Sequence, residues 1–308
     1  MKKMVLGMDA SWAQGSSFDW KGLEQTELKY AIIKATDGLS VDKCFERNQK
    51  EIRKTNLILG HYHWFQPSID PIAQAEHFVR TIDLQPGDLP PSLDFEDDDG
   101  GSARGKKLLE NFLTFMFEVE RLTGRRAIVY TGNWFWKLAV SDIDSEEMSQ
   151  RPLWHAQYPG GVPLKSMDYS KYAQLMGQPT VAKPWSSRNI APAFWQFDGD
   201  KGLYSPQGID IDVNIYYGDM DDLNKFIEES HIGEAQKLFK YNLKNPKQLQ
   251  QALIDLGYDL GSAGADGIVG KRTTEALKSF QGDMELDVNG SADHETMEKI
   301  KEMWFLNN

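Results

Sequence analysis

The chain has 308 residues, of which 40% are hydrophobic and 26% charged, and it carries a formal net charge of −12 at pH 7. This is the composition of a soluble globular protein, and an acidic balance without a basic stripe argues against nucleic acid or an anionic membrane surface as a partner. Cys44 is the single cysteine, which excludes an internal disulfide and a thiolate metal cluster.

The first 230 residues alternate short apolar runs with longer amphipathic segments. Strands are expected at residues 4–10, 30–36, 58–65, 91–96, 127–131, 153–158, 193–197 and 209–214, and helices at 44–55, 71–82, 105–123 and 221–229. Asp70 suits the N-cap of the second helix, and Gly124 suits the end of the third. The alternation predicts an α/β fold, an irregular (β/α)8-type barrel of parallel strands that is closed or nearly so.

The last part of the chain has a different texture. Three amphipathic helices are expected at residues 246–256, 271–280 and 293–303. A weak repeat relates Asp266-Gly267 and Thr273 to Asn289-Gly290 and Thr296. We therefore predict two domains, a barrel over residues 1–230 and a small three-helix all-α domain over residues 231–308.

Two carboxylates lie close together in the fourth predicted strand. Asp94 and Glu96 stand at positions i and i+2, so both should face one side of the strand with Cα atoms ~7 Å apart. Acids on the buried side of a strand are costly, which favours a functional role. The acidic run at residues 97–99 is equally consistent with an exposed turn. A pair of carboxylates a few ångströms apart is what glycoside hydrolysis requires.

Other acids are expected at the same end of the barrel. Asp9 ends the first predicted strand, and Asp210 and Asp212 lie on the eighth. Strands one and eight are neighbours in a closed barrel, so Asp9 and Asp212 would converge with the Asp94 pair at the rim. Aromatic residues that could stack on sugar rings occur at the same level, although core packing explains any single one equally well: Trp12, Tyr62, Trp64, Tyr130, Trp154 and Trp195.

An ordered set of motifs resembles the family 25 glycoside hydrolases, the muramidase-type lysozymes. It covers nearly all of residues 4–217 and consists of GMDAS (7–11), AIIKATDG (31–38), GHYHW (60–64), LDFE (93–96), VYT (129–131), LWHA (153–156), WQF (195–197) and IDVN (211–214). The segment from LQQAL (249–253) through DGIVG (266–270) to Phe280-Gln281 is similar to the small three-helix peptidoglycan-binding module. This pairing is typical of phage endolysins and bacterial autolysins.

The resemblance implies a role for each site residue. Glu96 matches the general acid and Asp94 the carboxylate that stabilises the charged intermediate, and Asp9 and Asp212 match the other two active-site acids. The predicted substrate-binding residues are Tyr62, Trp64, Tyr130, Trp154, Trp195 and Gln196. The implied reaction is hydrolysis of the β-1,4 bond between N-acetylmuramic acid and N-acetylglucosamine in bacterial peptidoglycan, without cofactor or metal. Retaining, inverting and substrate-assisted stereochemistry all stay open.

Four points complicate this assignment. Asp210 precedes Asp212 by two residues, which leaves open which of them faces the cleft. His61-x-His63 places two imidazoles on one strand face, so a metal-dependent hydrolase is an alternative. A second alternative is a barrel that binds wall carbohydrate without catalysis. In the second repeat of the tail, residues 291–293 replace the apolar-then-Gly pattern and put the ligand role of that turn in doubt.

The N-terminal apolar run is too short for a signal-peptide core, and no run of 18 apolar residues occurs, so membrane insertion is not expected. We expect synthesis in the cytoplasm, release by lysis or a holin-type lesion, and action on the bacterial cell wall. The sequence does not define the oligomeric state.

Overall fold

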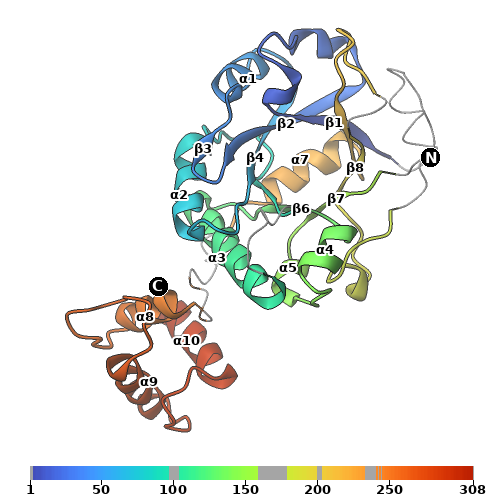
Figure 1. The fold of residues 1–308 in the computed structure, drawn as a ribbon. Coiled ribbons are helices and arrows are strands. Elements are labelled where there is room, and N and C mark those ends of the chain that lie inside the picture. The colour runs from blue at the N-terminus through green and yellow to red at the C-terminus, as the bar shows by residue number, and fades with distance from the viewer. Residues whose placement is uncertain are drawn as a thin grey trace. The chain divides into compact units, whose positions relative to one another are not determined.

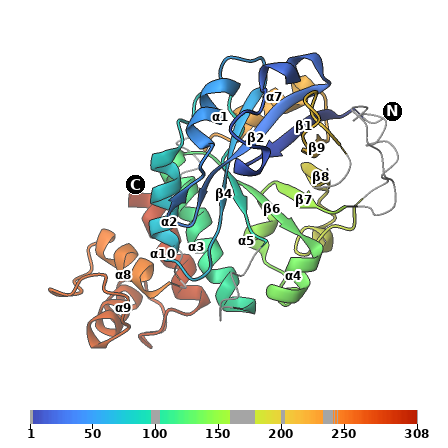
Figure 2. The same ribbon diagram turned by 45° about the horizontal axis from the view of Figure 1, so that its top comes forward.

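The computed structural model describes residues 3–96, 104–158, 179–199, 203–232, 241, 243 and 245–307. The chain forms two compact units, Met1–His231 and Ile232–Asn308, drawn in Figure 1 and from a second direction in Figure 2. Among the residues covered by these ranges, no helix is long and apolar enough to cross a bilayer.

The first unit is a closed barrel of eight strands. They are β1 (Val5–Ala10), β2 (Leu28–Asp37), β4 (Ile58–Trp64), β5 (Ser92–Asp94), β6 (Ile128–Gly132), β7 (Leu153–Ala156), β8 (Phe194–Asp198) and β9 (Asp212–Tyr216), with β3 (Ser40–Val41) added to the edge of β2. Pairing of β1 with β2 completes the ring. The α/β barrel predicted from the sequence is confirmed, and each of its eight strands overlaps a predicted one.

The direction of the last strand differs from the prediction. β1, β2 and β4 to β8 run parallel, but β9 is antiparallel to both of its neighbours, β8 and β1. The physical reason lies in the connection: a parallel return needs a long crossover, usually a helix, whereas the chain before β9 turns back on itself with a bridge between Tyr204 and Asp210. Asp212 therefore begins its strand, and the reversal brings it to the rim where the parallel strands end.

Helices surround the ring of strands. They are α1 (Phe45–Ile52), α2 (Pro71–Thr81), α3 (Gly105–Thr123), α4 (Asn133–Ala139) and α5 (Glu146–Ser149), with short 3-10 turns η1 (Trp12–Gln14), η2 (Lys21–Gln25) and η3 (Ser186–Arg188), and a further helix, α7 (Met220–Glu229), packs at one end of the ring. Asp70 caps α2 by accepting the Ala73 N–H, and Gly124 ends α3 in the left-handed region, both as predicted. α4 and α5 are additional to the predicted set.

Alternation of side chains along the strands creates two separate cores. Outward residues such as Leu6, Met8 and Val129 pack with the helices. Inward residues such as Val5, Ile128 and Phe194 pack with α7, whose Phe226 ring lies 5.5 Å from that of Phe194. In Figure 1, α7 is seen through the ring of strands. Because Val5, Ile128 and Phe194 stand at or near the starts of their strands, α7 closes the end of the barrel opposite to the rim where Asp9 lies.

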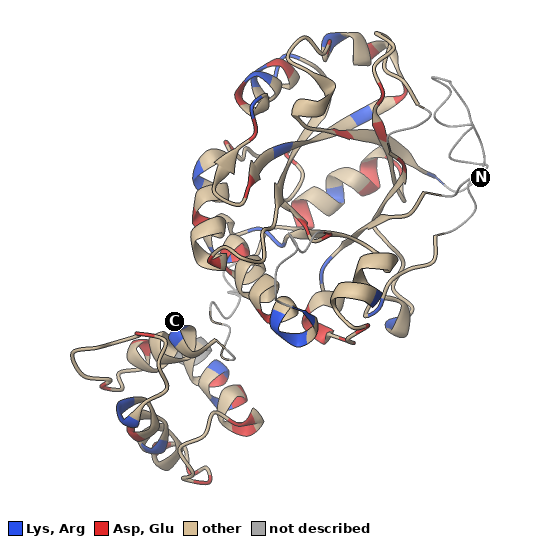
Figure 3. Cartoon of the chain, in the orientation of Figure 1, with Lys and Arg blue, Asp and Glu red and all other residues tan. Residues whose placement is uncertain are grey.

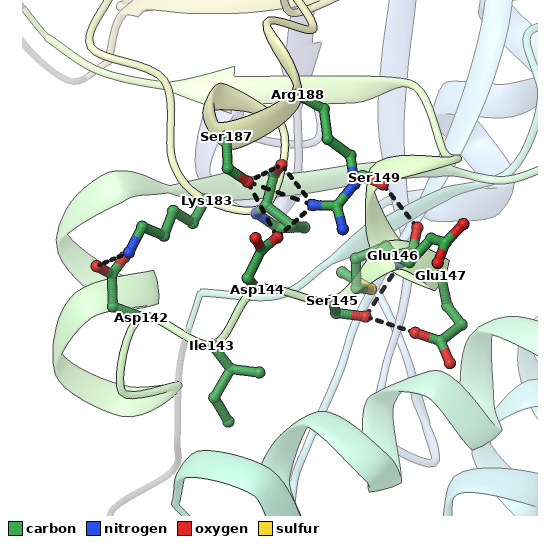
Figure 4. Close-up of polar contacts among 12 residues, drawn as sticks. Asp142, Ile143, Asp144, Ser145, Glu146, Glu147, Ser149, Lys183, Ser187 and Arg188 are labelled. Carbon is green, nitrogen blue, oxygen red and sulfur yellow. Dashed lines mark hydrogen bonds and ion pairs between the residues drawn. The ribbon is translucent and has the colours of Figure 1, made fainter. Parts of the chain in front are cut away.

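The connection before β8 is fastened to the loop between α4 and α5. Lys183 pairs with Asp142 at 3.1 Å, Ser187 donates to Asp144 at 3.0 Å, and Arg188 also pairs with Asp144, as Figure 4 shows. Beneath these contacts the buried Trp185 indole donates to the Arg151 carbonyl at 2.8 Å. In the described part of this connection, η3 is the helical turn, and residues 159–178 lie outside the described residues.

The second unit contains α8 (Pro246–Asp255), α9 (Lys271–Asp283) and α10 (His294–Asn307), in line with the three predicted helices. Its core is formed by Leu249, Leu253, Leu277, Phe280 and Ile300, among others. These helices make the predicted small all-α fold.

The sequence repeat in this unit corresponds to two turns built in the same way. The Gln250 amide nitrogen donates to Asp266, to the Ile268 carbonyl and to Thr273, while its oxygen accepts the Gly267 N–H at 2.7 Å. Gln281 makes the same four bonds to the second turn, where its partners are Asn289, Ser291, Thr296 and Gly290. Both glycines have a positive φ (85° and 75°), which explains why the repeat retains glycine there.

Candidate active site

A cleft of about 260 Å³ opens at the rim where the parallel strands end. It contains all four predicted acids and is lined by Asp9, Ala10, Ser11, Ala13, Gln14, Tyr62, Trp64, Asp94, Glu96, Tyr130, Trp154, Tyr158, Gln196 and Asp212. Figure 3 colours acidic positions red, and several of them lie on the barrel strands. The convergence of acids predicted from the sequence is therefore present.

Asp94 and Glu96 enter the cleft from β5 and the residues after it. Between them Phe95 points outward, where its ring stacks on Phe112 with centroids 4.0 Å apart, and its N–H donates to the Tyr130 carbonyl at 2.9 Å. This outward anchor holds the two acids on the inner side, so both line the same cleft.

The Asp94 carboxyl group is the most unusual polar group of the cleft. Its side chain is 5% exposed, and Oδ1 has no hydrogen-bond partner among the described residues. Burial, and next the charge of Glu96, raise the pKa of Asp94 well above its ordinary value, against a smaller opposing effect of Lys34. Such a group retains a proton more strongly than a solvated carboxyl does, and it offers an acceptor oxygen to whatever enters the cleft.

Asp9 is held in a very different way. Its Oδ2 accepts hydrogen bonds from Gln196 Nε2 at 2.7 Å and from Asn214 Nδ2 at 2.8 Å. The Gln196 oxygen accepts from the hydroxyl groups of Tyr130 and Tyr158, at 2.7 Å and 2.6 Å. Asn214 Oδ1 accepts from the Trp154 indole at 2.7 Å. Two oriented amides thus fix the direction of the Asp9 carboxylate.

The structure distinguishes Asp212 from Asp210. Asp212 stands directly opposite Asp9 in the β1–β9 register and lines the cleft. Asp210 is exposed and lies in the turn before β9. The acid that faces the cleft is therefore Asp212.

Trp195 corrects the predicted substrate-binding set. It is 1% exposed, packs in the outer core, and donates its indole N–H to the Gln157 carbonyl at 2.9 Å. The reason is strand alternation: adjacent residues face opposite sides, so Trp195 and Gln196 cannot both point inward. Gln196 lines the cleft, as do the other predicted members Tyr62, Trp64, Tyr130 and Trp154.

Two residues of the hydrogen-bond network around Asp9, Asn214 and Tyr158, were not among the site residues predicted from the sequence. Asn214 follows Asp212 by two residues, and this spacing was the signal that it faces inward. Tyr158 lies two residues beyond the end of β7, where strand periodicity no longer predicts which way a side chain points. Its hydrogen bond to Gln196 shows that it belongs to the site.

Lys34 brings a cation to one side of the cleft. It is 8% exposed, donates to Asp37 at 2.8 Å, and lies 4.3 Å from the centre of the Trp64 ring. Asp37 also accepts from Gln66 at 2.7 Å, so the ammonium group is held beside a cleft aromatic ring by a fixed carboxylate.

The histidine pair considered as a metal site faces away from the cleft. His63 contacts Thr36 Oγ1 at 2.7 Å and Gln74 Oε1 at 3.1 Å, and His61 contacts Gln49 Oε1 at 2.9 Å. Burial lowers the pKa of both imidazoles to about 3. The described residues contain no group of three or more His, Cys, Asp or Glu side chains arranged to hold a metal ion. These histidines serve the packing of β4 against the helices.

Comparison with known proteins identifies similar sequences and a similar fold. The chain is 29% identical over 231 residues to the uncharacterized protein YegX of Escherichia coli K12, covering 73% of this chain and 74% of that protein. It is 27% identical over 289 residues to the autolytic lysozyme of Clostridium acetobutylicum, covering 92% and 74%. The fold matches the crystal structure of a lysozyme from Streptomyces coelicolor with a TM-score of 0.59 at 24% identity, over 73% of this chain and 98% of that one.

Two family models match separate parts of the sequence. The peptidoglycan binding domain matches residues 242–300, within the second unit. The glycosyl hydrolases family 25 model matches residues 8–201, which hold Asp9, the Asp94–Glu96 pair and most of the cleft. The chain therefore belongs to glycosyl hydrolases family 25.

Proposed function

We propose that this protein is a muramidase that hydrolyses the β-1,4 bond between N-acetylmuramic acid and N-acetylglucosamine in bacterial peptidoglycan. The observation that carries the proposal is the Asp94–Glu96 pair, which faces one aromatic-lined cleft. One buried oxygen of Asp94 has no hydrogen-bond partner among the residues that the structure describes. The autolytic lysozyme similarity and the second unit's match to a peptidoglycan binding domain support this substrate.

The pair supplies the proton for cleavage. Because burial and Glu96 raise the pKa of Asp94, the two carboxyl groups together keep one proton at a pH where separate carboxyl groups would have lost both. Glu96 is the more exposed of the two and donates this proton to the leaving glycosidic oxygen as the bond to the anomeric carbon breaks.

Asp94 orients the substrate's own nucleophile. Its Oδ1, which no described residue contacts by a hydrogen bond, accepts the N–H of the 2-acetamido group, and the acetamido oxygen then bonds to the anomeric carbon as the leaving oxygen departs. A hydrogen bond from substrate favours the ionised form of Asp94, so the shared proton moves to Glu96 when substrate binds. Water then attacks the anomeric carbon, breaks its bond to the acetamido oxygen and returns a proton to Glu96.

The second unit would keep the enzyme on its polymeric substrate. Its first turn exposes Ile268 and Val269, 71% and 55% exposed, whereas the second turn carries Ser291 in the equivalent place. Binding to the wall raises the local concentration of glycan strands around the cleft.

The proposal is tested by incubating the full-length protein with purified peptidoglycan and measuring new reducing ends. We expect steady release that is unchanged by a metal chelator. Binding to the wall without reducing ends would instead favour the non-catalytic carbohydrate-binding barrel, and loss of activity with chelator would favour a metal-dependent hydrolase.

A further inference from the structure

The orientation of Asn214 is fixed by chemistry. An indole N–H can only donate, so the Asn214 atom that lies 2.7 Å from Trp154 Nε1 must be the carbonyl oxygen. The amide nitrogen is then the atom 2.8 Å from Asp9 Oδ2, and it donates to that oxygen. Asn214 is completely buried, which leaves little room for other arrangements.

Gln196 is oriented in the same sense by two phenols. Its oxygen accepts from Tyr130 and Tyr158, which directs its amide nitrogen to the same oxygen of Asp9, at 2.7 Å. Asp9 Oδ2 therefore faces two N–H donors. A proton placed on that oxygen would displace one of them, so the arrangement favours the ionised carboxylate.

We infer that Trp154, Asn214 and Gln196 are positioning residues that hold Asp9 as a permanent carboxylate in the cleft, distinct from the Asp94–Glu96 pair that carries the proton. The inference rests on the proposed function. In glycoside hydrolysis, positive charge develops at the anomeric carbon and ring oxygen, and a carboxylate already fixed beside them stabilises that charge without reorganisation. Trp154 and Gln196 then act through Asp9 rather than chiefly as sugar contacts.

The experiment removes the donor that orients Asn214. In Trp154→Phe an aromatic ring is kept but the indole N–H is lost, so Asn214 can rotate and present its oxygen to Asp9. We expect kcat/KM on soluble peptidoglycan fragments to fall about tenfold and the acidic limb of its pH profile to move about one unit higher. The basic limb, set by the Asp94–Glu96 proton, should stay in place. The other titratable groups near Asp9 are Tyr30, Tyr62, Asp94, Glu96, Tyr130, Tyr158 and Asp212, and Lys34 acts on the neighbouring Asp94.

Trp195→Phe is a matched control, because it deletes one indole hydrogen bond from a buried tryptophan on the neighbouring strand, on the outer face. It should leave both limbs of the profile unchanged. Tyr158→Phe is a milder second variant that removes one of two donors to Gln196 from a half-exposed residue. It should move the acidic limb in the same direction by a smaller amount, and it keeps the test available if Trp154→Phe folds poorly.

The outcomes separate the two proposals. If the wild-type protein releases no reducing ends, the proposed function fails. If it does release them but Trp154→Phe and Tyr158→Phe keep the wild-type acidic limb, or if Trp195→Phe shifts it equally, the positioning role of this layer is overturned.

Discussion

Buried charges are arranged differently outside and inside the barrel. On the outer side, Glu120 and Arg151 are almost completely buried and meet in a two-bond ion pair at 3.1 Å and 2.7 Å. On the inner side, four carboxylates gather in one cleft, and one Asp94 oxygen has no hydrogen-bond partner in the part of the chain that the structure describes. In the matched pair each charge offsets the desolvation cost of the other, whereas gathered like charges destabilise the fold, a cost that a functional role explains.

The largest expected effect comes from the inner face. Replacing Glu96 with Gln removes the transferable proton but keeps the side-chain shape, so kcat should fall by about 10²- to 10⁴-fold while the fold is retained. Reducing-end release and circular dichroism measure the two halves of this prediction. A variant that hydrolyses peptidoglycan at the wild-type rate would remove Glu96 from the mechanism.

The converse change on the outer face should alter stability and not catalysis. Glu120→Gln leaves Arg151 without its buried counter-charge and should lower the free energy of unfolding by about 3–5 kcal/mol, measured by urea denaturation. Glu76→Gln is the control, because the Glu76–Arg80 pair is exposed on both sides and its loss should cost less than about 1 kcal/mol. Equal costs for both variants would contradict the contrast between matched and exposed pairs.

Asp212 and Asp210 allow an acid inside the cleft to be compared with an acid outside it in one short segment. Asp212→Asn removes a cleft carboxylate opposite Asp9 and should reduce kcat/KM by on the order of tenfold. Asp210→Asn changes an exposed acid outside the cleft and should have no measurable effect. The reverse ranking would show that the wrong acid has been placed in the site.

A smaller effect should appear in the pH dependence of stability. Because the folded protein raises the pKa of Asp94, it binds this proton more tightly than the unfolded chain does. The free energy of unfolding therefore falls as pH rises from about 4 to the raised folded pKa, by at most about 1.4 kcal/mol per pH unit from this group. In Asp94→Asn this component is absent, so the stability of the variant relative to wild type should increase across that window. A constant difference would argue against the raised pKa.

Much of the barrel could be predicted from sequence because each strand shows a compact apolar run. Alternation also placed Asp94 and Glu96 on one side correctly. The reversal of β9 was not predicted, since apolar content does not encode strand direction and only the short connection at Tyr204 and Asp210 reveals it. The acids still converge, because Asp212 is the first residue of the reversed strand, and in a reversed strand it is the first residue that lies at the rim.

The site was predictable as a set of residue types but not as a set of contacts. Trp195 was included in the predicted cleft because it is aromatic. It is adjacent to Gln196 on the strand, so the two side chains face opposite sides and Trp195 lies outside the cleft. The roles of Asn214 and Gln196 depend on which amide atom faces Asp9, which only their tertiary partners decide. In the tail, the repeated Asp/Asn-Gly turns were visible, but the buried Gln250 and Gln281 that tie them stand at unequal distances from their turns in sequence.

The most direct test of the central claim is the identity of the new reducing sugar. Peptidoglycan digested by the wild-type protein is reduced with borohydride, hydrolysed and separated, so that the sugar at each new chain end is identified as its alcohol. Cleavage by the Glu96–Asp94 pair as proposed gives reduced N-acetylmuramic acid, with none formed by Glu96→Gln. Reduced N-acetylglucosamine in its place, or no new reducing ends, would contradict the account.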